Sequence, residues 1–266
     1  MLLHNFILFF LFIFYFLYNI SFSFADAAEA WQLGPQDPAS SVMEGIINFH
    51  NFLLCIIIAI GISVFLVLIE VLIKFDSKKN IKASKFAHAS ALEIIWTVIP
   101  ALVLLFIAGP SFSLLYALDE GYSKSVIIKV IGHQWYWTYE IPNIVDTEKM
   151  NYVSFDSYLK NTNDLFLGQF RLLEVDAALL IPQWTHISFV ITSADVIHSW
   201  AVPSFGIKLD ACPGRLAHIT MYFQRIGSFY GQCSEICGTG HGFMPISIRV
   251  VTPEVWFQWA DFSGSK

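Results

Sequence analysis

Three long apolar stretches occupy the first half of the chain. The first, residues 2–25, is rich in phenylalanine, contains no lysine or arginine, and ends in Ser-Phe-Ala before Asp26. It predicts a leader, with a retained membrane helix as the alternative. Residues 46–75 and 89–116 are each longer than the roughly 20 helical residues that cross a hydrocarbon layer. Within residues 46–120 they predict a transmembrane hairpin.

The loop between the second and third apolar stretches is basic. It holds a third of the lysine and arginine residues of the chain: Lys74, Lys78, Lys79, Lys82 and Lys85. Basic loops stay on the cytoplasmic or matrix side of a membrane. We therefore expect residues 26–45, and everything after Asp119, on the outer side.

From Val126 onward, apolar residues alternate with polar ones at period two. The clearest runs are Ile187, Phe189 and Ile191, then Ile219, Met221 and Phe223, then Ile246, Ile248 and Val250. This period predicts half-buried strands, and turn residues such as Pro213-Gly214 separate them. The predicted fold class is membrane-anchored all-β, with an antiparallel sandwich or barrel over residues 121–266 and a short terminal helix after Thr252-Pro253.

Composition narrows the class of protein. The 266 residues are 56% hydrophobic and only 14% charged, which is too apolar for an ordinary soluble domain. The net charge is −6, and no basic stretch offers the footprint that nucleic acid requires, so we expect no nucleic-acid partner. The four cysteines do not predict a disulfide framework, because Cys55 lies in an apolar stretch out of reach of the others.

The segment CSEICGTGHGFMP, residues 233–245, is dense in soft metal ligands. It supplies the thiols of Cys233 and Cys237, the imidazole of His241 and the thioether of Met244, a set that favours copper. A blue-copper site uses one thiolate, whereas two cysteines four residues apart can each share sulfur lone pairs between two metal ions. The segment therefore indicates a dinuclear copper centre. A disulfide, or half of a structural zinc site, are the alternatives.

Two residues extend this candidate site. His198 lies at the end of a predicted strand. A lone histidine is more often a satisfied polar residue than a metal ligand. However, strand ends and neighbouring loops meet at one pole of a barrel, which would bring His198 close to the cysteine segment. Glu235 lies between the cysteines, so its carbonyl can bind the same metal while its side chain holds a hard cation such as magnesium. The alternative for Glu235 is a solvated carboxylate.

An aromatic run and a membrane carboxylate are further candidates. In GHQWYWTYE, strand alternation would place Trp135, Trp137 and Tyr139 on one face, either in the core or at an interface. Glu93 lies about one turn inside the third apolar stretch. It either pairs with Lys85 or belongs to a proton pathway.

Several segments together carry a resemblance to a known family. They are WQLGPQDPASSVMEGI, LEIIWTVIPA, GHQWYWTYE, LGQFRLLEVD, TSADVIHSWAVPS, DACPGRL and YGQCSEICGTGHGFMPI. In content and order they closely resemble subunit II of the haem-copper cytochrome c oxidases, of the mitochondrial kind, over nearly the whole chain after Asp26. Two other classes of protein are the alternatives. A quinol oxidase subunit has the same architecture but lacks the copper ligands, which are all present here. A membrane-tethered copper carrier or storage protein needs the ligands but no exposed aromatic face.

The resemblance implies a cupredoxin-like Greek-key barrel with a dinuclear copper site, and a hairpin that packs on the catalytic subunit I. The implied ligands are His198, Cys233, Glu235 by its carbonyl, Cys237, His241 and Met244. The Glu235 carboxylate would also reach a magnesium ion shared with subunit I. Trp135 stands where electrons enter from cytochrome c, and Glu93 stands near the mouth of a proton channel.

The implied function is electron transfer from reduced cytochrome c to haem in subunit I, where oxygen reduction is coupled to proton pumping. The implied partners are subunit I, cytochrome c, other oxidase subunits and the lipid bilayer. The implied location is the mitochondrial inner membrane, as a multi-pass protein with the copper domain in the intermembrane space. Four carboxylates offer an acidic surface for cytochrome c: Asp146, Glu148, Asp195 and Asp210.

Two positions depart from the family pattern. Ala194 replaces a carboxylate that relatives often carry in the docking patch. Cys212 replaces an aliphatic residue, and we expect it to be a small buried hydrophobe.

Overall fold

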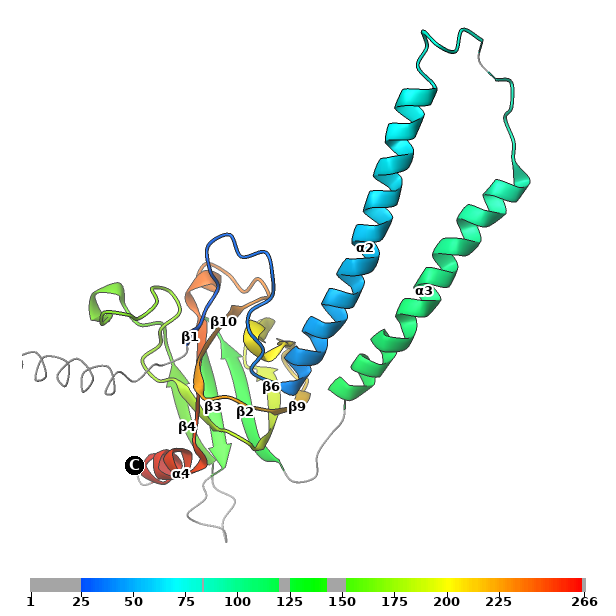
Figure 1. The fold of residues 1–266 in the computed structure, drawn as a ribbon. Helices are drawn as coiled ribbons and strands as arrows, with labels where there is room; N and C mark the ends of the chain where they lie inside the picture. Colours follow the sequence, from blue (N-terminus) through cyan, green and yellow to red (C-terminus); the bar gives the residue numbers. More distant parts are fainter. Residues whose placement is uncertain (1–24, 83, 120–124, 143–151, 265–266) are drawn as a thin grey trace, which may run out of the picture.

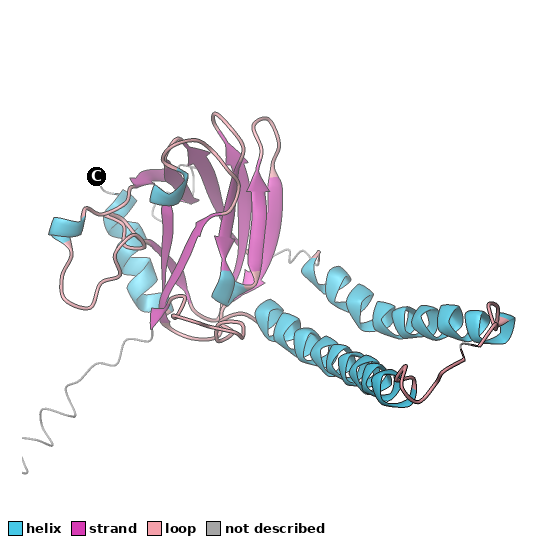
Figure 2. Cartoon of the chain, turned by 90° about the horizontal axis from the view of Figure 1, so that it is seen from above, coloured by secondary structure: helices cyan, strands magenta, loops and turns pink. Residues whose placement is uncertain are grey.

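The computed structural model describes residues 25–82, 84–119, 125–142 and 152–264, and places a helical hairpin beside a β-domain (Figure 1). The hairpin consists of α2 (Ser41–Lys74) and α3 (Ser90–Leu118). In Figure 2 the strands form one block, the hairpin leaves from one end, and α4 (Pro253–Gly264) lies on the side away from the hairpin. The predicted leader, except for Ala25 in β1, and the carboxylates Asp146 and Glu148 lie outside the described residues.

Both helices of the hairpin have the length and composition of membrane spans. The most apolar 18-residue windows of α2 and α3 have mean hydropathies of 3.3 and 2.4. The α3 helix continues through Pro100 and Pro110. The rings of Phe52 and Phe106 pack across the hairpin with their centroids 5.6 Å apart.

The first turn of α2 is attached to the β-domain. Ser40 is its N-cap, and the Ser40 hydroxyl oxygen accepts a hydrogen bond from the Met43 N–H at 3.0 Å. The same hydroxyl donates to the carbonyl of Phe205 at 2.7 Å. This cap lets the helix begin five residues before the predicted stretch at residue 46.

The β-domain contains two sheets. The first has the order β5 (Leu179–Pro182), β11 (Pro245–Val251), β10 (Gly227–Cys233), β7 (His198–Val202) and β8 (Ile207–Ala211), and β1 (Ala25–Asp26) also pairs with β10. The second has the order β4 (Tyr152–Ser157), β3 (Tyr136–Pro142), β2 (Val126–His133), β6 (His186–Ser193) and β9 (Ala217–Tyr222). Short 3-10 turns occupy η1 (Thr162–Asp164), η2 (Pro203–Phe205) and η3 (His241–Phe243).

The pairing within these sheets is mixed. β2 runs parallel to β6, and β11 runs parallel to β5, so the expectation of purely antiparallel sheets is wrong in this detail. The reason is that the chain crosses between sheets, which brings strands far apart in sequence side by side. The fold class itself, a transmembrane hairpin followed by a cupredoxin-like all-β domain, is confirmed. The division of the chain at residues 45 and 120 stays a prediction.

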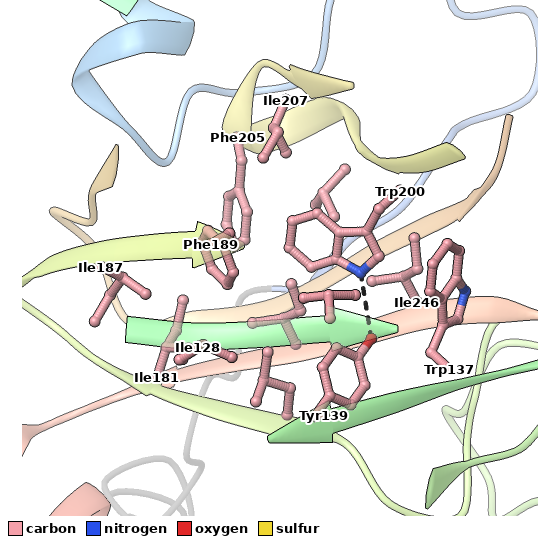
Figure 3. Packing of buried hydrophobic residues seen from close by; sticks show 14 of the residues in the cluster. Ile128, Trp137, Tyr139, Ile181, Ile187, Phe189, Trp200, Phe205, Ile207 and Ile246 are labelled. Atoms are coloured by element: carbon pink, nitrogen blue, oxygen red, sulfur yellow. Dashed lines mark hydrogen bonds between the residues drawn. The ribbon is translucent and has the colours of Figure 1, made fainter. Parts of the chain in front are cut away.

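The core lies between the two sheets (Figure 3). Ile187, Phe189 and Ile191, which the period-two pattern placed on one strand face, are fully buried in β6. The Trp200 indole N–H donates to the Tyr139 hydroxyl at 3.3 Å, so both fully buried rings satisfy their polar ends. This packing fixes the two sheets against each other and thereby the loops at their ends.

Close approach of β10 and β7 requires a glycine at position 231. A Cβ atom there would lie 2.0 Å from the carbonyl oxygen of Ala201 on the paired strand. Because backbone cannot give way as a side chain does, we expect Gly231→Ala to lower the free energy of unfolding by about 1–3 kcal/mol. Gly34→Ala is the matched control, since a Cβ at Gly34 meets no atom within 4 Å. Denaturant unfolding of the full chain in detergent, followed by tryptophan fluorescence, would show equal stabilities if this steric account were wrong.

Candidate metal centre

The ligand loop, residues 233–244, connects the paired strands β10 and β11. The antiparallel register places Gln232 opposite Pro245, so Cys233 and Met244 start and end the loop next to each other. Within it, Gly238 adopts a φ of +116°, a conformation that favours glycine. The His241 N–H then donates to the Gly238 carbonyl at 3.2 Å and turns the loop back through η3.

The donor atoms of the six predicted metal ligands lie in one continuous cluster. The Sγ atoms of Cys233 and Cys237 are 4.0 Å apart, which is far beyond a disulfide bond. The Cys233 sulfur lies 3.9 Å from His198 Nδ1 and 3.3 Å from the Glu235 carbonyl oxygen. The Cys237 sulfur lies 3.6 Å from His241 Nδ1 and 3.5 Å from Met244 Sδ. The ligand atoms of His198, Cys233 and Cys237 all lie within 4.8 Å of one another.

The chemistry of these donors fits copper. Each thiol has its own imidazole neighbour, His198 beside Cys233 and His241 beside Cys237. Thiol, imidazole and thioether groups are the ligands that copper prefers, and the set exceeds the four that a structural zinc site uses. His198, Cys233, Cys237 and Met244 are all buried, so the cluster is shielded from water.

Burial also controls the protonation of the cluster. It raises the pKa of the Cys237 thiol to about 12, and the nearby Cys233 adds to this rise. The metal-free thiol is therefore neutral at physiological pH. A metal ion that binds as a thiolate complex must displace this proton, and its positive charge favours that displacement.

Asp195 orients His198. The His198 Nε2–H donates to the Asp195 carboxylate at 2.8 Å, which leaves Nδ1 facing Cys233. The other carboxylate oxygen accepts the Gln134 N–H at 2.7 Å. Burial acts to raise the pKa of Asp195, but the hydrogen bonds from His198, Gln134 and Val196 outweigh it and the pKa is lowered. Asp195, predicted as a docking carboxylate, is therefore held inside the site's hydrogen-bond network.

The aromatic run is split between the core and the ligand loop. Trp135 lies in the turn between β2 and β3 and is 37% exposed, whereas Trp137 and Tyr139 are fully buried, so the prediction that all three share a face is wrong. The turn takes Trp135 out of the strand alternation. The Trp135 indole N–H donates to the Cys237 carbonyl at 3.1 Å, and Trp137 donates to the Met244 carbonyl at 3.3 Å.

Sequence reasoning did not predict that three residues hold the ligands in place. Gln134 donates to the Cys237 carbonyl through its side chain at 2.8 Å, Trp137 holds the end of the ligand loop, and Asp195 holds His198. The carboxylate three residues before His198 was a usable signal for Asp195, because metal-binding histidines commonly donate their second N–H to a carboxylate. Nothing in the sequence points to Gln134.

Glu93 and Asp210 lie outside the cluster. Glu93 is exposed in the first turn of α3, where its carboxylate accepts the Ala89 N–H at 3.4 Å, and in the described part of the chain no ion pair joins it to Lys85. Asp210 is exposed on β8.

Cys212 is half-buried, so the expectation of a small buried hydrophobe is wrong. It follows β8 immediately and lines a surface hollow with Lys208, Asp210 and Arg215. Because β8 is the edge strand of its sheet and charged residues lie beside Cys212, this side chain is not enclosed by apolar groups as a core residue would be.

Comparison with known proteins identifies the family. The model of the cytochrome c oxidase subunit II periplasmic domain matches residues 126–251, and that of its transmembrane domain matches residues 28–114. Cytochrome c oxidase subunit 2 of Phytophthora megasperma is 52% identical over 91% of this chain and 90% of its own length. That of Cyanidium caldarium is 50% identical over 88% of this chain and 91% of its own.

Among solved structures, the periplasmic domain of subunit II of cytochrome oxidase from Bradyrhizobium japonicum is 40% identical, with a TM-score of 0.48, and the match covers 54% of this chain and 96% of that one. The membrane-span helices, the copper-type donor cluster and the curated relatives agree with one another. The chain therefore belongs to the cytochrome c oxidase subunit II family, and it is a membrane-anchored subunit of an oxidoreductase.

Proposed function

We propose that this subunit accepts electrons from reduced cytochrome c at a dinuclear copper centre and passes them to haem in the catalytic subunit I. There oxygen reduction is coupled to proton pumping. The observation that carries the proposal is the pair of thiols 4.0 Å apart, with an imidazole nitrogen 3.9 Å from the Cys233 sulfur and another 3.6 Å from the Cys237 sulfur. Two copper ions would supply a one-electron couple at this position, held by the residues of the cluster.

The proposed ligands are the side chains of His198, Cys233, Cys237, His241 and Met244, with Glu235 contributing its carbonyl. Four of these side chains, those of His198, Cys233, Cys237 and Met244, are buried, and Asp195 holds the His198 ring by a hydrogen bond. This favours a site that changes geometry little on reduction. The half-buried Glu235 carboxylate is proposed to hold Mg²⁺, a hard cation that prefers oxygen ligands, at the border with subunit I.

The proposed location is the mitochondrial inner membrane, with the copper domain in the intermembrane space. The basic loop between α2 and α3 supports this orientation, because such loops stay on the matrix side. Glu93, in the α3 turn nearest this loop, then lies on the matrix side, and we propose that it stands at the mouth of a proton channel.

Trp135 is the proposed point where electrons enter. Its ring is partly exposed, and its N–H binds the carbonyl of Cys237, so one side chain joins the protein surface to a metal ligand. Phenylalanine keeps a ring but loses this hydrogen bond. We expect Trp135→Phe in the assembled oxidase to slow reduction by cytochrome c at least roughly tenfold, a barrier change of about 1.4 kcal/mol.

Stopped-flow spectroscopy of copper reduction provides the measurement. Copper content should be unchanged in the variant, since Trp135 is not a metal ligand. Trp184→Phe is the matched control, because the exposed Trp184 ring packs on Tyr222 rather than on the ligand loop. Equal reduction rates in Trp135→Phe and the wild type, with copper content intact, would remove Trp135 from the pathway.

A further inference from the structure

The basic loop at the far end of the hairpin presents lysine side chains that pair with no acidic group among the residues that the structure describes. Lys78, Lys79, Lys82 and Lys85 are all exposed. Within the described residues, the only ion pair of this loop joins Lys74 to Glu70 on the same helix. Four ammonium groups are therefore available to an external partner.

The loop's own polar groups hydrogen-bond to its backbone, and none of those described pairs with these ammonium groups. The single acidic residue between positions 74 and 86, Asp76, accepts the Lys78 backbone N–H at 2.9 Å. The Asn80 side chain donates to the Lys74 carbonyl at 2.7 Å and closes the end of α2. The turn is thus built from Asp76 and Asn80, and the lysine stems extend from it.

Apolar side chains are interleaved with the lysines. Phe75, Ile81 and Phe86 are 68%, 91% and 73% exposed. In water such exposure is unfavourable, but at a membrane surface these side chains enter the acyl boundary while lysine stems extend to the headgroups. Because the loop directly joins two membrane spans, it lies at that boundary.

We propose that this loop binds anionic phospholipid headgroups of the leaflet in which it lies. Lysine carries a compact charge on a flexible stem, which suits phosphate groups that are mobile in the plane of the membrane. Clusters of four or more basic residues next to a membrane helix bind anionic lipid surfaces. An acidic protein surface is the competing partner, but the interleaved apolar residues favour a lipid.

The test uses the full chain reconstituted in phosphatidylcholine vesicles with a trace of spin-labelled lipid. Electron spin resonance measures the fraction of labelled lipid that the protein immobilises. We expect the wild type to immobilise labelled phosphatidylglycerol at least twofold more than labelled phosphatidylcholine. The ratio of immobilised phosphatidylglycerol to immobilised phosphatidylcholine should fall toward one in the variant with Lys78, Lys79, Lys82 and Lys85 changed to glutamine. The same ratio should fall for the wild type in high salt.

Two features of this design separate lipid binding from other effects. The label is present in both leaflets, so the result does not depend on the orientation of the protein or on the proposed electron transfer. The variant with the same four lysines changed to arginine retains the charge and should retain most of the preference. A wild type without preference for phosphatidylglycerol, or a glutamine variant with an unchanged preference, would overturn the proposal. If the wild type shows no lipid preference and the purified oxidase complex carrying the glutamine variant loses a subunit, the loop binds a protein partner and the proposal fails.

Discussion

Cys237→Ser is expected to abolish the paired-thiol site and with it oxidation of cytochrome c. The Cys237 sulfur contacts Cys233, His241 and Met244, so its loss removes the centre of the donor cluster. Serine preserves the volume of the side chain but offers a hard oxygen in place of a soft sulfur. Removing residues that merely support metal ligands costs roughly 10–100-fold in metal affinity, and we expect loss of this ligand to cost more than about 100-fold.

Copper analysis and oxidase assays of the purified complex test this expectation. Cys212→Ser is the matched control, because Cys212 is a free thiol of the same domain outside the donor cluster. The control should retain its copper and its activity. Retention of wild-type copper content in Cys237→Ser would show that this sulfur is not a ligand.

Asp195→Asn is expected to lower copper affinity about 10–100-fold, although Asp195 does not contact the proposed metal position. Both carboxylate oxygens accept hydrogen bonds: one from the His198 imidazole and the Val196 N–H, the other from the Gln134 N–H. An asparagine has one carbonyl oxygen, and its NH₂ group cannot accept the other bond. Either His198 loses its orientation or the turn that carries Trp135 loses its attachment to the site.

Competition for copper with a chelator of known affinity measures this change. Asp210→Asn provides the control, because it removes the same charge from an exposed position on the neighbouring strand β8. The two variants should differ in copper affinity, while their secondary structure should match that of the wild type. If both bind copper as the wild type does, the orienting role of Asp195 is wrong.

The sequence was most informative where a repeating period or a dense ligand set was present. The apolar lengths predicted both membrane helices, and alternation in the strands predicted burial of Ile187, Phe189 and Ile191. The spacing of Cys233 and Cys237 indicates a shared metal site, and the two sulfurs lie 4.0 Å apart.

The sequence was least informative about contacts made by turns and by distant strands. The alternation rule placed Trp135 with Trp137 and Tyr139, but a turn at Gln134 and Trp135 interrupts the strand, so the rule did not apply there. Parallel pairing of β2 with β6 joins residues about 60 positions apart, which no local pattern encodes. The role of Gln134 depends on that pairing, because it brings the turn beside Asp195.

Metal content and electron spin resonance of the oxidised full chain test the central claim most directly. If the two thiols are shared between metal ions, each chain will bind two copper ions, and the signal will be split by two equivalent copper nuclei. One copper per chain with splitting from a single nucleus, or a zinc ion in place of copper, would contradict the account.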